Sequence, residues 1–226
     1  MTAPRYLGDR LRCERGGRVV FDGLGFALAP GGALVLRGPN GSGKSSLLRL
    51  MAGLLRPAAG SLSWTGAPAA LDAGDRRSAV AYAGHLDAVK PVLTVTEDLR
   101  FWARLAPEPG LLALFGVTDA QRTAEDRVSD ALTAFELEAL AGLPCRYLSA
   151  GQRRRLALAR LVTRPAALWL LDEPTASLDD ASTARLAAAI AAHRAAGGMV
   201  ALSTHLDLDL ADAGMLVLDR PAGPRP

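Results

Sequence analysis

The residues best suited to chemistry lie at positions 38–45, where glycines alternate with small polar residues before a lysine and a serine. Glycines let successive backbone N–H groups point at an anion, and the positive end of a following helix adds to the attraction. Lys44 can then reach the β- and γ-phosphates of a nucleotide, and the Ser45 hydroxyl can bind Mg²⁺. We therefore expect a phosphate-binding loop, whose candidate residues are Gly38, Pro39, Asn40, Gly41, Ser42, Gly43, Lys44, Ser45 and Ser46.

The elements around this loop are those that a phosphate-binding loop requires. Ala33–Leu36 form an apolar run typical of a buried strand, and apolar residues at helical spacing follow from Leu47 to Leu55. A chance glycine-rich turn between a strand and a helix is the alternative interpretation. Lys44 argues against it, because this arginine-rich chain has only two lysines and a compact charge suits a phosphate.

Two adjacent carboxylates, Asp172 and Glu173, end the apolar run Ala167–Leu171. The carboxyl end of a buried strand delivers its side chains to the crevice above an α/β sheet. Asp172 is then placed to hold Mg²⁺ together with Ser45, and Glu173 to orient or deprotonate an attacking water. A base in that position typically contributes ~10²–10⁴-fold in rate. An exposed acidic turn is common in isolation, but with the phosphate loop the pair predicts nucleotide hydrolysis.

Three further segments carry polar groups near the predicted ends of elements. Ser149–Gln152 begin a basic helix and offer a hydroxyl and N–H groups to an anion, although the same residues also make an ordinary helix cap. His205 follows a predicted strand and is placed to contact a γ-phosphate or the attacking water, with a plain surface histidine as the alternative. Ala176–Asp179 lie shortly after Glu173.

Length and composition favour one large α/β domain. The chain has 226 residues, 50% of them hydrophobic, which is enough for a sizeable core. Its formal net charge of +3 comes from scattered arginines and is weak support for a nucleic-acid partner. Cys13 and Cys145 lie far apart without metal-type spacing, so we expect reduced thiols.

No targeting or membrane segment is expected. Residues 1–5 lack the apolar core of a signal peptide, and no apolar stretch approaches the ~18 residues of a membrane span. We therefore expect a cytoplasmic protein that reaches a membrane only through a partner. Residues 220–226, rich in proline and glycine, are expected to fray.

The order of patterns predicts an α/β domain interrupted by helices. Short strands alternate around glycines within residues 5–37, residues 107–116 form a loop or short insertion, and residues 87–147 are mainly helical. The prediction is a single domain, residues 1–226, with a helical subdomain at about residues 87–150. Strands are predicted at 19–21, 25–28, 33–36, 61–65, 80–83, 167–171, 199–203 and 215–219, and helices at 47–55, 95–105, 119–140, 152–163 and 182–196.

The five motifs described above resemble, in order and spacing, those of the nucleotide-binding domain of ATP-binding cassette (ABC) transporters. The resemblance covers nearly the whole chain. It implies an α/β fold, namely a P-loop ABC-type ATPase core with an inserted helical subdomain and an N-terminal antiparallel β region. It also implies a transport-coupled ATPase that uses ATP and Mg²⁺.

The resemblance further implies a head-to-tail homodimer that encloses two ATP molecules. One subunit would supply the phosphate loop, the Mg²⁺ residues Ser45 and Asp172, and the catalytic residues Glu173 and His205. The opposite subunit would supply the signature residues Ser149, Gly151 and Gln152, and Asp179 would make contacts across the interface. Hydrolysis would open the dimer and so drive a membrane partner.

Two positions depart from the family's pattern. The family usually has a glutamine where His85 stands, and a histidine there can contact the metal-bound or attacking water, or neither. The aromatic residue that often stacks on adenine is absent at about Arg15, although a planar guanidinium can also stack on a base. The role of His85 and the strictness for ATP therefore stay open.

Within the family, the chain resembles the ATP-binding subunits of bacterial cytochrome c maturation complexes, the haem exporters. This resemblance rests on residues 82–85, 93–97, 148–161 and 168–174, whereas residues 107–118 are longer than that group usually has. It implies ATP hydrolysis coupled to haem delivery, integral membrane partner subunits, and a peripheral location on the cytoplasmic side of the inner membrane. The resemblance also implies that haem contacts lie in those partners, and the chain's cysteines and histidines form no ligand pattern.

Other classes of function fit the sequence less well. An ABC ATPase acting on DNA needs a long coiled coil, a translation-associated one needs two cassettes, and neither feature is present. A non-hydrolysing scaffold is disfavoured by the intact Lys44, Asp172 and Glu173. We therefore expect no nucleic-acid partner. The alternative left open is the ATPase subunit of an ABC transporter with a different cargo.

Overall fold

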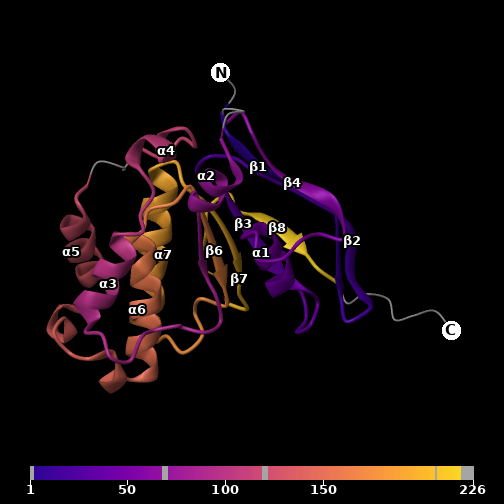
Figure 1. Cartoon of the computed structure of the whole chain (residues 1–226). Coiled ribbons are helices and arrows are strands. Elements are labelled where there is room, and N and C mark those ends of the chain that lie inside the picture. Colours follow the sequence, from indigo (N-terminus) through magenta and orange to yellow (C-terminus); the bar gives the residue numbers. More distant parts are fainter. Residues whose placement is uncertain (1–2, 68–70, 119–121, 207, 220–226) are drawn as a thin grey trace.

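The computed structural model describes residues 3–67, 71–118, 122–206 and 208–219, so the tail predicted to fray at 220–226 lies outside the described residues. A parallel sheet stands in the middle of the molecule, with an antiparallel sheet on one side and a group of helices on the other (Figure 1). The predicted α/β class with an N-terminal antiparallel region is thereby confirmed. Among the described residues, no helix is both long and apolar enough to cross a membrane.

The antiparallel sheet has the strand order β2-β1-β4, formed by β2 (Arg18–Leu28), β1 (Arg5–Arg15) and β4 (Ala59–Thr65). The prediction of two short strands at 19–21 and 25–28 is wrong, because both belong to the single strand β2. Gly23, which lies between the two predicted strands, has a φ of 69° at the point where the β1–β2 register shifts. A glycine inside a strand often marks such a bulge rather than the end of the strand.

The central sheet is parallel, with the order β5-β6-β7-β3-β8. Its strands are β5 (Val80–Ala83), β6 (Leu168–Asp172), β7 (Met199–Ser203), β3 (Ala33–Arg37) and β8 (Gly214–Val217). Each lies within two residues of its predicted bounds. Strands β6 and β7 are buried along their whole length, as expected for a parallel sheet covered on both faces.

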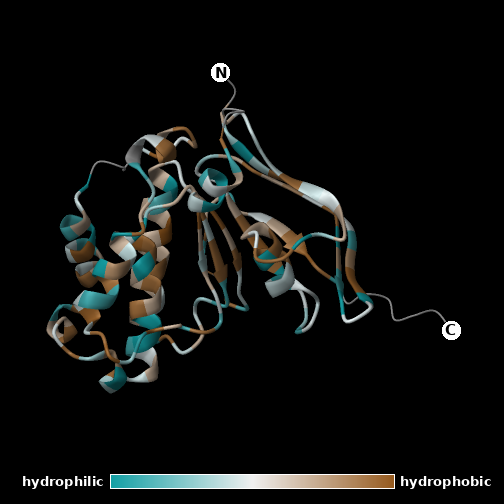
Figure 2. Ribbon diagram, in the orientation of Figure 1, coloured by the Kyte–Doolittle hydropathy of each residue, from teal (hydrophilic) through white to brown (hydrophobic). Residues whose placement is uncertain are grey.

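Side chains of the central sheet alternate between two hydrophobic cores. Leu34 and Leu36 pack with helix α1 (Lys44–Met51), whereas Ala33 and Val35 face the core that contains α6 (Ala150–Thr163) and α7 (Asp180–Ala195). Figure 2 shows hydrophobic residues concentrated on the central strands and on the inward faces of the helices. Because successive side chains of a strand point to opposite faces of the sheet, one apolar run contributes to both cores.

The helical region contains α3 (Val95–Ala103), α4 (Pro109–Ala113), α5 (Ala124–Ala134) and two single turns, η1 (Glu138–Leu140) and η2 (Cys145–Tyr147). Helices α3, α5 and α6 pack against one another. The helix predicted from 119 to 140 begins at Ala124 and breaks after Ala134, and residues 119–121 lie outside the described residues. The short helix α2 (Ala73–Ser78), with a capping box at Asp72, was not predicted.

Residues 107–116 are not a plain loop. They contain α4, and the fully buried Leu112 and Phe115 pack with Ala79 and Ala167 in a third core. The ring of Phe115 also meets Trp64 of β4, edge to face, with 4.6 Å between centroids. The segment therefore joins the antiparallel sheet to the parallel sheet. Of the two predicted alternatives, a loop or a short insertion, the plain loop is wrong, since the burial that forms α4 depends on residues distant in the sequence.

Candidate functional site

The predicted phosphate loop follows β3 at the carboxyl end of the central sheet and leads directly into α1. Gly38 has a φ of 140°, and a Cβ there would clash with the Leu218 carbonyl oxygen and lie 2.8 Å from Ser42 Oγ. Only glycine therefore allows the chain to leave β3 at this angle. The turn places the amino end of α1 over the sheet, where its N–H groups favour an anion.

Lys44 crosses this loop instead of extending into solvent. Its side chain is largely buried, and Nζ donates to the Gly38 carbonyl oxygen at 2.7 Å and to the Pro39 carbonyl oxygen at 3.3 Å. Ser42 Oγ is also buried and, within the described residues, has no hydrogen-bond partner. A buried ammonium and an unpaired buried hydroxyl are costly alone and are satisfied together by an anion such as a polyphosphate. The loop therefore fits the predicted nucleotide.

Ser45 and Asp172, predicted to act on one metal ion, meet in the structure. Ser45 Oγ donates to Asp172 Oδ1 at 2.8 Å, and the carboxylate is almost fully buried. Two residues missed in the sequence also bind this carboxylate: Ser203 Oγ donates to Oδ1 at 2.9 Å, and Tyr82 OH donates to Oδ2 at 3.3 Å. Ser203 could have been selected from the sequence, because it is a polar residue at the end of an apolar strand.

The donor set at Asp172 fits Mg²⁺. Hydroxyl and carboxylate oxygens are hard ligands, and Mg²⁺ usually takes only one or two from protein while phosphates and waters supply the rest. The described residues contain no cluster of three or more histidine, cysteine or acidic side chains that could hold a metal ion.

Glu173 and His205, the predicted catalytic residues, lie together beside this cluster. His205 Nε2 is 3.4 Å from Glu173 Oε1, and the histidine is the more exposed of the two. Glu173 has a φ of 49°, a left-handed conformation that costs on the order of 1 kcal/mol in a residue with a side chain. Its N–H donates to both the carbonyl oxygen and Oγ of Ser203, at 3.1 and 3.0 Å. Such strain, fixed by neighbours, is a feature of functional sites.

The signature residues form the start of α6. Ser149 Oγ accepts from the Gln152 N–H, and Gln152 Oε1 accepts from the Ser149 N–H at 2.8 Å, so the two make a capping box. Gly151 lies in the first turn, against the Ser177 carbonyl oxygen. No hydrogen bond in the described part of the chain joins this segment to the phosphate loop. Within one subunit the segment is a helix cap, and its action on ATP stays a prediction.

Asp179 caps α7 in a similar way. Its Oδ1 accepts from the Ser182 N–H at 2.8 Å. Hydrogen bonds from Ser182 hold the pKa of Asp179 below its usual value. This contact explains the aspartate within the subunit, and its place in a dimer interface stays a prediction.

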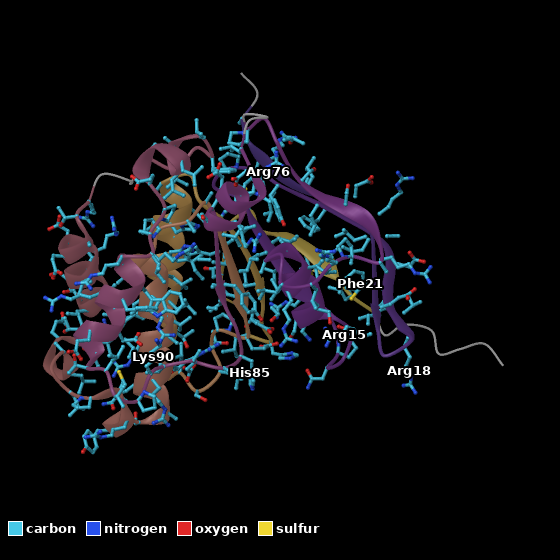
Figure 3. The ribbon with its side chains drawn as sticks, viewed as in Figure 1. Arg15, Arg18, Phe21, Arg76, His85 and Lys90 are labelled. Atoms are coloured by element: carbon cyan, nitrogen blue, oxygen red, sulfur yellow. The ribbon has the colours of Figure 1, made fainter. Side chains whose placement is uncertain are left out.

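His85 and Arg15 are both exposed in the structure. Figure 3 shows His85 below the central sheet and Arg15 near the turn that joins β1 and β2. Val20 and Phe21 of β2, which sequence reasoning did not select, lie directly against the phosphate loop: a Cβ on Gly43 would be 2.5 Å from Val20 Cγ1 and 3.2 Å from Phe21 Cδ1. They form an apolar wall beside the loop, whereas the role of Arg15 stays a prediction.

Comparisons with known proteins agree with this geometry. Residues 21–176 match the family model described as ABC transporter. The cytochrome c biogenesis ATP-binding export protein CcmA of Rhodospirillum rubrum is 54% identical over 214 residues, 95% of this chain and 85% of that protein. The protein of the same name from Paramagnetospirillum magneticum is 53% identical over 220 residues, 97% of this chain and 96% of that protein.

Solved structures show a likeness in fold. The ATP binding subunit of an ABC transporter superposes with a TM-score of 0.77 at 24% identity, covering 96% of this chain and 88% of that one. The dimeric structure of MJ0796, a bacterial ABC transporter cassette, gives a TM-score of 0.70 at 21% identity, covering 95% of this chain and 94% of that one.

Proposed function

Because this chain belongs to the ABC transporter family, we propose that it is the ATP-hydrolysing subunit of a haem exporter that serves cytochrome c biogenesis. The convergence of Ser45, Asp172, Glu173 and His205 at the edge of one sheet carries the assignment of ATP hydrolysis. The biological setting is supported by identities of 53–54% to export proteins named for cytochrome c biogenesis.

Binding of ATP begins at the phosphate loop. The N–H groups of the loop and of α1 surround the phosphates, and Lys44 Nζ turns from the loop carbonyls toward them. The Ser42 hydroxyl gains a hydrogen-bond partner, which it lacks among the described residues. Val20 and Phe21 give the rest of the nucleotide an apolar surface next to Gly43. Ser45 and Asp172 would hold Mg²⁺, which would offset the negative charge of the phosphates.

Hydrolysis is then assigned to Glu173 and His205. The Glu173 carboxylate orients a water and takes its proton as the water oxygen bonds to the γ-phosphorus and the bond to the ADP oxygen breaks. His205 Nε2, beside that carboxylate, donates a hydrogen bond to the outgoing phosphate. The products are ADP and inorganic phosphate.

The chain acts, in this proposal, as a homodimer attached to integral membrane subunits at the cytoplasmic face of the inner membrane. Ser149 and Ala150 are exposed at the amino end of α6, so the Ala150 N–H of one copy and the positive end of its helix would be open to the ATP of another. The dimeric state of a cassette with the same fold supports this arrangement. Asp179 would then lie near the interface, on the loop that also contacts Gly151.

The Glu173→Gln variant tests both the assigned ATP hydrolysis and the assigned membrane partners. We expect ATP binding to persist while turnover falls by ~10²–10⁴-fold, since a positioned base is lost. Glu138→Gln, an exposed glutamate in the helical region, is the matched control and should hydrolyse ATP like the wild type. Wild-type turnover in Glu173→Gln would rule out the assigned base.

The same variant can capture partners from native membranes in the presence of ATP, with the captured proteins identified by mass spectrometry. Membrane subunits of the cytochrome c biogenesis machinery are the expected result. Capture of an unrelated permease would leave the ATPase intact and overturn the assigned cargo.

A further inference from the structure

Arg154 is the most enclosed charged group near the site that the mechanism above does not use. It lies in α6, five residues after the capping serine Ser149, and only 3% of the residue is exposed. Its guanidinium donates hydrogen bonds in two directions. One group of acceptors lies on the segment that carries Glu173, and the other lies on the loop after β5.

We propose that Arg154 is a positioning residue for hydrolysis, which holds the Glu173 peptide in its left-handed conformation and ties it to the loop of residues 84–87. This inference rests on the assignment of Glu173 proposed above. Arg154 touches neither nucleotide nor water in the proposal, and it acts only through the backbone of Glu173.

The first half of the argument is the contact with Glu173. Arg154 Nη2 donates to the Glu173 carbonyl oxygen at 2.7 Å, and Nε donates to the Pro174 carbonyl oxygen at 3.2 Å. On the other side of the same residue, the Glu173 N–H donates to the carbonyl oxygen and to Oγ of Ser203. A charged donor makes the stronger kind of hydrogen bond, so Arg154 and Ser203 together fix a φ of 49° that the residue disfavours. The direction of the Glu173 side chain follows from that backbone.

The second half is the contact with the loop after β5. Arg154 Nη1 donates to the Gly84 carbonyl oxygen at 2.9 Å and lies 3.2 Å from Asp87 Oδ1. Between these two acceptors the loop presents His85 and Leu86 to solvent, and Leu86 is 81% exposed. One rigid guanidinium therefore spans two segments almost 90 residues apart in the chain. A shift of this loop changes the hydrogen bonds that hold Glu173.

Arg164 is a useful comparison, because its hydrogen bonds have only a structural role. It ends α6 and donates to the carbonyl oxygens of Leu105, Val80 and Ser78, at 3.2, 3.0 and 3.1 Å. It thus makes the same kind of bonds to backbone as Arg154, but none of them reaches the Glu173 segment. Arg164→Gln is therefore the matched control for Arg154→Gln.

The experiment measures ATP turnover, KM and thermal stability of the full-length chain in both variants. We expect kcat of Arg154→Gln to fall by about 10²-fold, the loss typical of a slightly misplaced catalytic group, while KM changes by less than about threefold. Arg164→Gln should lose thermal stability to a similar degree and retain kcat within about threefold at a temperature where it is folded. Equal losses of kcat in the two variants would overturn the proposal.

A double variant separates a role through Glu173 from any other. Arg154→Gln combined with Glu173→Gln should be no slower than Glu173→Gln alone, because residues that act as a unit are not additive. A further loss in the double variant would contradict the proposal. Full turnover in the Glu173→Gln single variant would refute the assigned base. If Glu173→Gln is inactive but Arg154→Gln keeps full turnover, only the role of Arg154 is refuted.

Arg154→Lys covers the case in which Arg154→Gln does not fold. Lysine keeps the charge but lacks the planar fork that reaches both segments. We expect this variant to fold and to lose at least about tenfold in kcat, and wild-type kcat would overturn the proposal.

Discussion

Acid should destabilise this protein through His193, a residue far from the nucleotide site. The imidazole stacks on Trp169, with 4.0 Å between ring centroids and 5° between planes. On another side it lies so close to Gly198 that a Cβ there would clash with it. A position near the carboxyl end of α7 favours a positive charge. Burial lowers the pKa of His193 to about 4, from an ordinary value of 6.5, and outweighs the hydrogen bond between Nε2 and the Met199 carbonyl oxygen, which raises it.

The sign and size of the effect follow from these two pKa values. Between pH 6.5 and about 4, the unfolded chain binds a proton at this histidine that the folded chain does not. The free energy of unfolding therefore falls as the pH falls through that window, and it is unaffected by this group above the window. A difference of about 2.5 pH units corresponds to up to about 3 kcal/mol, at ~1.4 kcal/mol for each unit.

Urea unfolding of the wild type and of His193→Gln, from neutral pH down to about pH 4, measures this contribution. Glutamine removes the titrating group, so its curve should lose less stability with acid than the wild-type curve. His85→Gln, an exposed histidine, is the control and should follow the wild type. Parallel curves for wild type and His193→Gln would show that the imidazole is not enclosed as described.

Two further variants test the phosphate loop and the third core. Lys44→Ala should weaken ATP binding at least about tenfold, because a charge-assisted bond to phosphate is lost, and unchanged affinity in calorimetry would mean that the phosphates bind elsewhere. Phe115→Ala should lower the free energy of unfolding by about 3–5 kcal/mol, because a fully buried ring leaves a cavity beside Trp64. The exposed neighbour Leu114→Ala should change it by less than about 1 kcal/mol, and equal losses would contradict the description of this core.

The meeting of Ser45 and Asp172 could be predicted from the sequence, although 127 residues separate them. Both follow apolar runs that had to be strands of one parallel sheet, and the carboxyl ends of such strands meet at one edge. The prediction for Ser45 and Asp172 succeeded because local pattern and global topology point to the same arrangement. The meeting of Glu173 and His205 was expected only from the resemblance to the ABC family, because a histidine after a strand can equally be a surface residue.

The features that could not be predicted depend on distant contacts. Helix α4 is too short to be stable alone, and it forms because Leu112 and Phe115 are buried by residues far away in the chain. Arg153, Arg154 and Arg155 are consecutive, and nothing in the sequence marks Arg154 as the buried one, because its acceptors come from two loops that only the folded chain places beside α6. Gly23 was ambiguous, since a turn and a bulge use the same residue type.

The strand order of the central sheet also determines when, during translation, the nucleotide site can form. Strand β3, which leads into the phosphate loop, pairs on one side with β7 and on the other with β8, and both are made last. Residues 38–198 must be synthesised before either neighbour exists. At ~5–20 residues per second, translation leaves this apolar strand without a partner for ~8–30 s. The nascent chain thus carries an unpaired strand through most of its synthesis. It gains the ability to bind ATP only as the last strands leave the ribosome.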